Sequence, residues 1–198
     1  NTPARLKYLK SENTEAYNSI HLIEKLALAH SDIKFSLTNN DKIVVKTSGS
    51  DILLKTIHEI YGLNVSNKML EFKNGNNDFD IYGYICKPEI LRSNRNDLSV
   101  FVNDRVVRNN EINKAINDAY YTYKPEGKYP VVILKINTDP TLVDVNIHPT
   151  KQDVKISKME ELYDLIYTTI KDTLYQNLLI PNALKEESVN IIKDSVIA

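Results

Sequence analysis

The stretch PVVILKIN at residues 130–137 decides the fold. It is a nearly continuous apolar run, bounded by Pro130 on one side and by Asp139-Pro140 on the other. Such a run between turn-forming residues is typical of a strand at the centre of a sheet. The following run, LVDVNI at 142–147, alternates apolar and polar residues, which indicates a strand with one buried face. The segments on either side are therefore expected to complete a sheet.

Two strand pairs precede the central run. Strands are predicted at 69–73 and 79–86, joined by a turn-rich Asn-Gly-Asn-Asn segment. Closer to the central run, Val100–Val102 and Arg105–Val107 flank the dipeptide Asn103-Asp104. Two turn-forming residues between β-branched runs predict a tight hairpin with positive φ at its centre.

Helices should cover this sheet. Asn109 or Asn110 can cap one helix, and Ser157-Lys158-Met159-Glu160 has the spacing of a capping box that starts another. Each helix has one apolar face at helical spacing. The faces consist of Ile112, Ala115, Ile116, Ala119, Tyr120 and Tyr123 in the first helix, and of Met159, Leu162, Leu165, Ile166, Ile170 and Leu174 in the second. The expected fold class is α+β, a mixed β-sheet with helices packed on it.

The N-terminal part of the chain shows a second pattern. An apolar stripe at helical spacing predicts a helix that ends near Ser31. Strands are predicted at 33–37 and 42–46, on either side of a turn rich in Asn. Ser50 can cap a short helix that Gly62 closes.

Composition narrows the classes of protein. Of 198 residues, 42% are hydrophobic and 26% charged, as in ordinary globular proteins. No apolar run approaches the roughly 20 residues of a membrane helix, and no signal-peptide core follows the first ten residues, so a cytoplasmic location without membrane contact is expected. Cys86 is the only cysteine, so no internal disulfide can form, and its strand-like surroundings predict a buried, inert thiol. The sequence begins without Met in a helical pattern, which predicts a truncated N-terminus.

The usual constellations of catalytic residues are missing from the sequence. The histidines are scattered and no Gly-rich phosphate loop is present, so neither a metal site nor a self-contained enzyme is expected. Lys151 stands out because a half-buried strand runs into Pro149, which removes a backbone donor and leaves the lysine in a projecting loop. On the residues alone, Lys151 either meets a phosphate or is one more solvated surface lysine.

Three rare motifs follow one another in the chain. They are NTPARLKYLK at 1–10, VFVNDRVVR at 100–108 and DVNIHPTKQDVKI at 144–156. They closely resemble motifs of the MutL family of DNA mismatch-repair proteins, which are ATPases of the GHKL group. The resemblance extends to about residue 180. It favours mismatch repair over the transducer of a type II topoisomerase, whose lysine loop is built around QTK, and over a non-catalytic DNA- or protein-binding module.

The resemblance implies a division of the chain and a role for one loop. Residues 1–48 would be the end of an ATPase domain, 49–180 a transducer domain, and 181–198 the start of a linker. The transducer would resemble the second domain of a ribosomal small-subunit protein and of gyrase B. ATP and Mg²⁺ would bind in the full-length protein, upstream of this chain, which alone would hold no cofactor and would not be an enzyme. Lys151 would act catalytically by contacting the γ-phosphate of ATP, with Thr150 beside it on the phosphate side.

The resemblance also implies partners. The best candidates for a DNA-binding patch are Arg92, Arg95, Arg105 and Arg108, with Lys87 beside them. Contact with a DNA backbone needs only point charges, so binding to double or single strands would be weak and without sequence specificity. Ordinary surface charge is the alternative, and Asp104, where the family usually has Gly, offsets part of the charge of Arg105. A mismatch-recognition protein, other repair proteins and a second copy of the full-length protein are the other expected partners.

Overall fold

The computed structural model describes residues 11–144 and 154–178. The predictions that concern residues 1–10, 145–153 and 179–198 lie outside the described residues, and they include the roles of Thr150 and Lys151. The chain folds into two compact units. The first contains the described residues up to Asn67 together with Asp104–Val106, and the second contains Lys68–Asn103 and the described residues from Val107 onward. The domain boundary expected after residue 48 falls within the first of these units and stays a prediction.

The first unit contains two longer helices, a short one and a hairpin. Its elements are α2 (Glu12–Ala29), β1 (Ser36–Asn39), β2 (Lys42–Lys46), α3 (Leu53–Tyr61) and α4 (Leu63–Ser66). The predicted helix and hairpin are confirmed, and both turn residues, Asn40 and Asp41, have positive φ. The first strand begins later than predicted because the N–H of Ile33 donates to the carbonyl of His30 at 3.1 Å. That hydrogen bond closes the turn after α2.

The start of α3 corrects a prediction, while its end confirms one. Ile52, not Ser50, precedes the first turn, and its side chain makes no capping hydrogen bond. Asp51 has φ of 61° and redirects the chain between the two residues. The hydroxyl of Ser50 is buried and has no hydrogen-bond partner in the described part of the chain. Gly62 closes α3 with φ of 79°, a conformation in which a residue with a Cβ is strained.

The chain after Asn67 builds a five-stranded mixed sheet in the order β3-β4-β9-β6-β7. Its strands are β3 (Met69–Gly75), β4 (Phe79–Cys86), β6 (Leu98–Val102), β7 (Arg105–Val107) and β9 (Val132–Thr138). The apolar run therefore does form the central strand, antiparallel to β4 and parallel to β6. Gly83 of β4 lets the strands approach closely, since a Cβ there would lie 2.0 Å from the carbonyl oxygen of Ile133. The α+β fold class is confirmed.

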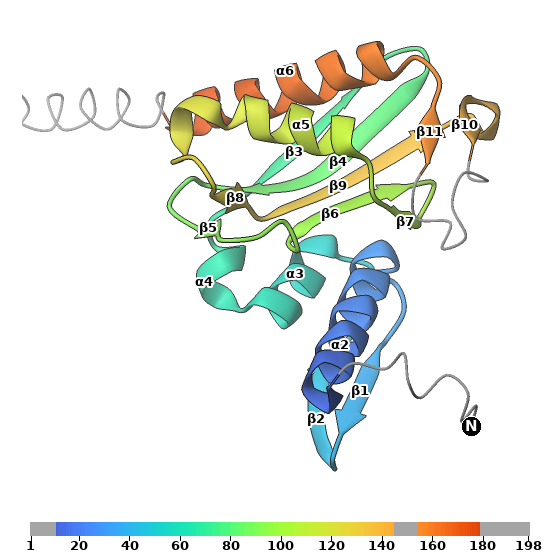
Figure 1. Cartoon of the computed structure of the whole chain (residues 1–198), viewed down its shortest axis with the longest axis vertical. Helices are drawn as coiled ribbons and strands as arrows, with labels where there is room; N and C mark the ends of the chain where they lie inside the picture. The colour runs from blue at the N-terminus through green and yellow to red at the C-terminus, as the bar shows by residue number, and fades with distance from the viewer. Residues whose placement is uncertain (1–10, 145–153, 179–198) are drawn as a thin grey trace, which may run out of the picture. The chain divides into compact units, whose positions relative to one another are not determined.

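Two helices cover one face of the sheet, as Figure 1 shows. They are α5 (Asn110–Ala119) and α6 (Met159–Leu178), and their apolar faces pack on the sheet residues in one core. Short elements lie in the segments between these helices and the long strands: β5 (Leu91–Arg92), η1 (Tyr121–Tyr123), β8 (Tyr129–Pro130), η2 (Pro140–Leu142), β10 (Val143–Asp144) and β11 (Lys155–Ile156). The turn between β6 and β7 has positive φ at Asn103 and Asp104, as predicted.

Cys86 is fully buried at the end of β4, which confirms its predicted burial, and burial raises the pKa of its thiol to about 11. Among the described residues, no helix is long and apolar enough to cross a membrane. Within the same residues, no group of His, Cys, Asp and Glu side chains is arranged to hold a metal ion.

Candidate functional site

The lysine segment, residues 145–153, leaves and rejoins the described fold at one place. β10 and β11 pair antiparallel there, with Asp144 opposite Lys155. On the returning side, Val154 and Ile156 are buried in the core of the sheet and its helices. This short strand pair, the β10–β11 base, holds the two ends of the lysine segment side by side.

Asn109 joins the β10–β11 base to helix α5. Its Oδ1 accepts hydrogen bonds from the N–H groups of Glu111 and Ile112 at 2.9 and 3.0 Å, so it is the cap, one of the two residues predicted for that place. Its Nδ2 donates to the carbonyl oxygen of Val154 at 3.2 Å. One half-buried amide therefore fixes both the start of a core helix and the point where the lysine segment returns.

The four arginines predicted to contact DNA flank β6 at its two ends. Arg92 and Arg95 precede its first residue, whereas Arg105 and Arg108 follow the turn after its last. Arg92 is half-buried, and its Nε donates to Oδ2 of Asp97 at 2.6 Å. The other three arginines are exposed. Their role in DNA contact remains a prediction, but Arg92 already has a structural partner.

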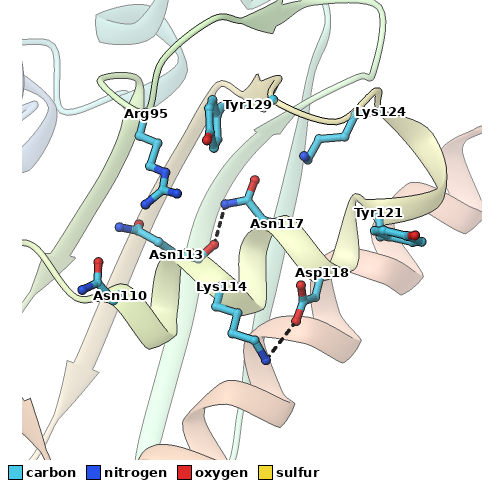
Figure 2. Close-up of a pocket in the computed structure, with 10 residues that line it drawn as sticks. Arg95, Asn110, Asn113, Lys114, Asn117, Asp118, Tyr121, Lys124 and Tyr129 are labelled. Atoms are coloured by element: carbon cyan, nitrogen blue, oxygen red, sulfur yellow. Dashed lines mark hydrogen bonds and ion pairs between the residues drawn. The ribbon is translucent and has the colours of Figure 1, made fainter.

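An open groove of about 490 Å³ lies along α5, and Arg95 is one of its lining residues. Helix α5 supplies a polar floor, as Figure 2 shows. The turn before β6 contributes Arg95, η1 contributes Tyr121, and the following segment contributes Lys124 and Tyr129. This α5 groove combines aromatic rings, amides and cations drawn from separate parts of the chain.

Two positively charged side chains of the α5 groove lie against the ring of Tyr129. The guanidinium carbon of Arg95 lies 5.2 Å from the centroid of its ring, and Nζ of Lys124 lies 5.6 Å from it. In Figure 2 the two cations stand on either side of the ring. Each cation is attracted by the π-electrons of the ring. No carboxylate of the described residues forms an ion pair with Arg95 or Lys124, so both charges are available to an anion.

On the side of the groove near α6, by contrast, the positive charge of Lys114 is neutralised by Asp118. Asp118 accepts a hydrogen bond from the hydroxyl of Tyr163 at 2.5 Å and lies 3.4 Å from Nζ of Lys114. The hydrogen bond to Asp118 raises the pKa of Tyr163 and also that of Lys114. The uncompensated positive charge of the groove is therefore that of Arg95 and Lys124.

The sequence predicted Arg95 as a binding residue but did not single out Tyr121, Lys124 or Tyr129. A signal was present, because the predicted helix places Tyr120 on its apolar face and the next residue off that face. The structure follows that phase, with Tyr120 fully buried and Tyr121 79% exposed. The signal in the sequence was therefore a tyrosine off the apolar face of the helix, three positions before a lysine.

A family model described as DNA mismatch repair protein, C-terminal domain, matches residues 57–175 of the chain. The chain is also 45% identical over 185 residues to the DNA mismatch repair protein MutL of Streptococcus agalactiae serotype III (strain NEM316). It has the same identity over the same length to the MutL of Ligilactobacillus salivarius (strain UCC118). Both matches cover 93% of this chain and 28% of the relative, so the chain spans little more than a quarter of these proteins.

Two solved structures share the fold. One is a crystal structure of the N-terminal domain of a DNA repair protein, with a TM-score of 0.70 and 24% identity over 90% of this chain and 59% of that chain. The other is the Aquifex aeolicus MutL ATPase domain complexed with ADP, with a TM-score of 0.56 and 19% identity over 84% of this chain and 53% of that chain. At these identities the likeness is one of fold.

Proposed function

We propose that this chain, which belongs to the DNA mismatch repair protein family, works as the transducer region of a MutL-like protein. In this proposal it couples ATP binding in a separate ATPase head to dimerisation of the heads, to DNA contact and to signalling toward partner repair proteins. The family match favours this role over that of a topoisomerase transducer. The chemistry of ATP hydrolysis belongs to the longer protein, and this chain contributes one lysine to it.

The observation that carries the proposal is the β10–β11 base. A flexible lysine is of little use for phosphate recognition unless the backbone that bears it is fixed in place. Here the lysine segment begins after Asp144, returns at Val154, and is held at both ends by strand pairing and by the side chain of Asn109. Such a support suits a lysine that must project from one domain toward a ligand held by another.

In the longer protein, Lys151 would place its ammonium near the γ-phosphate of ATP, with Thr150 on the same side. Positive charge at the transferring phosphoryl group stabilises the negative charge of the transition state. It also reports whether that group is present, because ADP lacks it. ATP and Mg²⁺ are thus the proposed cofactors of the longer protein.

The DNA role rests on the exposed arginines. Arg95, Arg105 and Arg108 are free of the structural ion pair that holds Arg92, and a DNA backbone requires no more than such point charges. We infer weak contact without sequence specificity. Mismatch-recognition and other repair proteins, and a second copy of the full-length protein, are the proposed protein partners.

Steady-state ATP hydrolysis by the full-length protein tests the proposal. Lys151→Ala should lower turnover by on the order of 100-fold, because it removes a charge aimed at the reacting phosphate. Lys155→Ala is the matched control, since Lys155 is an exposed lysine of β11 on the near side of the base. Lys151→Arg should restore only part of the turnover, because a broad planar fork replaces a compact ammonium. Wild-type turnover in a folded Lys151→Ala protein would return this residue to the solvated surface.

A further inference from the structure

The α5 groove contains two cations, Arg95 and Lys124, whose positions are restricted by an aromatic ring and whose charges no described carboxylate neutralises. Arg95 and Lys124 both lie against the ring of Tyr129, at 5.2 and 5.6 Å from its centroid. A ring restricts where a long side chain points but does not cancel its charge. These two distances also limit the separation of the two charges to about 11 Å, so they can meet neighbouring anionic groups of one ligand.

Tyr121 adds an aromatic surface to the same groove. It is 79% exposed, while its neighbour Tyr120 is fully buried and donates its hydroxyl to the carbonyl of Cys86. Core packing therefore anchors the chain one residue before the exposed ring. An exposed tyrosine on a fixed backbone, lining the same groove as two cations that have no ion-pair partner in the described part of the chain, is the combination with which proteins stack unpaired bases beside their phosphates.

The amides on the floor of the groove supply polar contacts of both kinds. Nδ2 of Asn117 donates to the carbonyl of Asn113 at 2.7 Å, which Figure 2 marks with a dashed line. Oδ1 of Asn117 is shielded from solvent and has no hydrogen-bond donor among the described residues. Asn113 and Asn110 place further amide groups along the same face of α5. A ligand with both anionic oxygens and N–H donors matches this set of groups.

We propose that the α5 groove binds an unpaired nucleotide, with its phosphate at Arg95 and Lys124 and its base stacked on Tyr121. This inference rests on the DNA contact of the proposed function and adds to it a site and a strand state. A base paired inside a duplex has no free face for Tyr121, so single strands are preferred over duplexes. The nucleotide can come from a single strand or from a free nucleotide, since both carry the same chemistry.

Fluorescence anisotropy with the 198-residue chain tests the site. The probe is an oligothymidylate of about ten nucleotides, within the site sizes of such grooves. Tyr121→Ala should weaken binding roughly 5- to 100-fold, because stacking on one base is lost. Tyr175→Ala is its control, since Tyr175 is an exposed tyrosine of α6 that does not line the groove. Lys124→Glu should weaken binding and flatten its salt dependence by about 0.7 in slope.

The control for Lys124 is Lys128→Glu. Lys128 is an exposed lysine in the same connecting segment and does not line the groove, so its reversal should leave the salt slope nearly unchanged. Competitors then separate the sources of the ligand. Displacement of the oligothymidylate by thymidine monophosphate at the groove identifies a free nucleotide as a sufficient ligand. Displacement only by longer strands identifies a single strand, and either result supports the proposal.

Three results would overturn the proposal that the α5 groove binds a nucleotide. They differ in whether the DNA contact of the proposed function fails as well. If single strand and duplex bind equally and Tyr121→Ala is without effect, the groove is not the site, although backbone contact by Arg105 and Arg108 survives. If polyglutamate competes as well as oligothymidylate and is weakened by Lys124→Glu, the groove takes an acidic protein segment. If neither form of DNA binds the wild-type chain at low salt, the proposed DNA contact fails together with the groove.

Discussion

The β10–β11 base and the α5 groove use polar side chains in opposite ways. At the base, the Asn109 amide makes three hydrogen bonds to backbone groups, and the neighbouring Val154 and Ile156 are buried. In the groove, Arg95 and Lys124 lie against an aromatic ring and form no ion pair with a described carboxylate, and Tyr121 is largely exposed to solvent. The first arrangement spends its polar groups on holding backbone in place, whereas the second leaves them available for a ligand.

This difference predicts how substitutions in the two regions should divide between stability and binding. A side chain whose donors and acceptors are all committed to the fold costs stability when it is removed. A side chain that is exposed and uncommitted costs almost none, and its removal is felt only when a ligand is present. The contrast between the two regions would be wrong if substitution of a base residue left stability unchanged, or if substitution of a groove residue lowered stability.

The largest stability effect is expected at Asn109. Asn109→Ala removes a helix cap and the hydrogen bond to Val154, so the free energy of unfolding should fall by about 2 kcal/mol. Asn110→Ala is the matched control, because Asn110 is the exposed neighbouring residue at the start of α5 and should change stability by less than about 0.5 kcal/mol. Urea unfolding of both variants gives the answer. Equal stability of the two variants would show that the base is not held in the way described.

The next effect is expected in duplex binding. Arg105→Glu and Arg108→Glu reverse exposed charges beside the β6–β7 turn and should each weaken duplex binding by about tenfold at low salt. The loss should be similar for matched, mismatched and unrelated duplexes, because backbone contacts carry no sequence information. Anisotropy titrations at several salt concentrations measure it. Unchanged affinity in both variants would assign these arginines to ordinary surface charge.

A smaller effect separates the two arginines that precede β6. Arg92→Ala breaks a half-buried ion pair with Asp97 and should destabilise the chain by about 1 kcal/mol, with little effect on nucleic-acid binding. Arg95→Ala should do the reverse, because Arg95 contacts a ring and has no carboxylate partner among the described residues. Melting temperatures and oligothymidylate titrations of the two variants test this exchange. Loss of stability in Arg95→Ala and not in Arg92→Ala would invert the assignment.

The sequence predicted the parts of this fold that depend on local pattern. The apolar run at 130–137 does form the central strand, and Asn103-Asp104 does turn with positive φ, because each signal lies within a few residues. The prediction that Ser50 caps α3 was wrong, and the reason is also local. Asp51 adopts positive φ, which redirects the chain and leaves the hydroxyl of Ser50 buried without a partner in the described residues.

The α5 groove was not predictable in the same way, because its residues come from separate segments. Arg95, Lys124 and Tyr129 meet only when β5 pairs with β8 and the turn before β6 is in place. The link from Asn109 to Val154 likewise joins residues far apart in sequence. The resemblance to the MutL family implies a role for Lys151, which lies outside the described residues and stays a prediction, and of the groove residues it singled out only Arg95. Local sequence pattern therefore predicted the secondary-structure elements and the motifs. The α5 groove and the β10–β11 base depend instead on contacts between residues far apart in the sequence.

The most direct test of the central claim, that the β10–β11 base positions Lys151, is a double-mutant cycle in the full-length protein. Steady-state ATP turnover is compared for wild type, Asn109→Ala, Lys151→Ala and the double variant, below the melting transition of the least stable protein. Asn109→Ala should lower turnover severalfold when Lys151 is present and not at all when it is absent. The coupling energy should then fall in the range of roughly 0.5–3 kcal/mol seen for interacting residues. Independent effects, in which the double variant loses the product of the two single losses, would contradict the account.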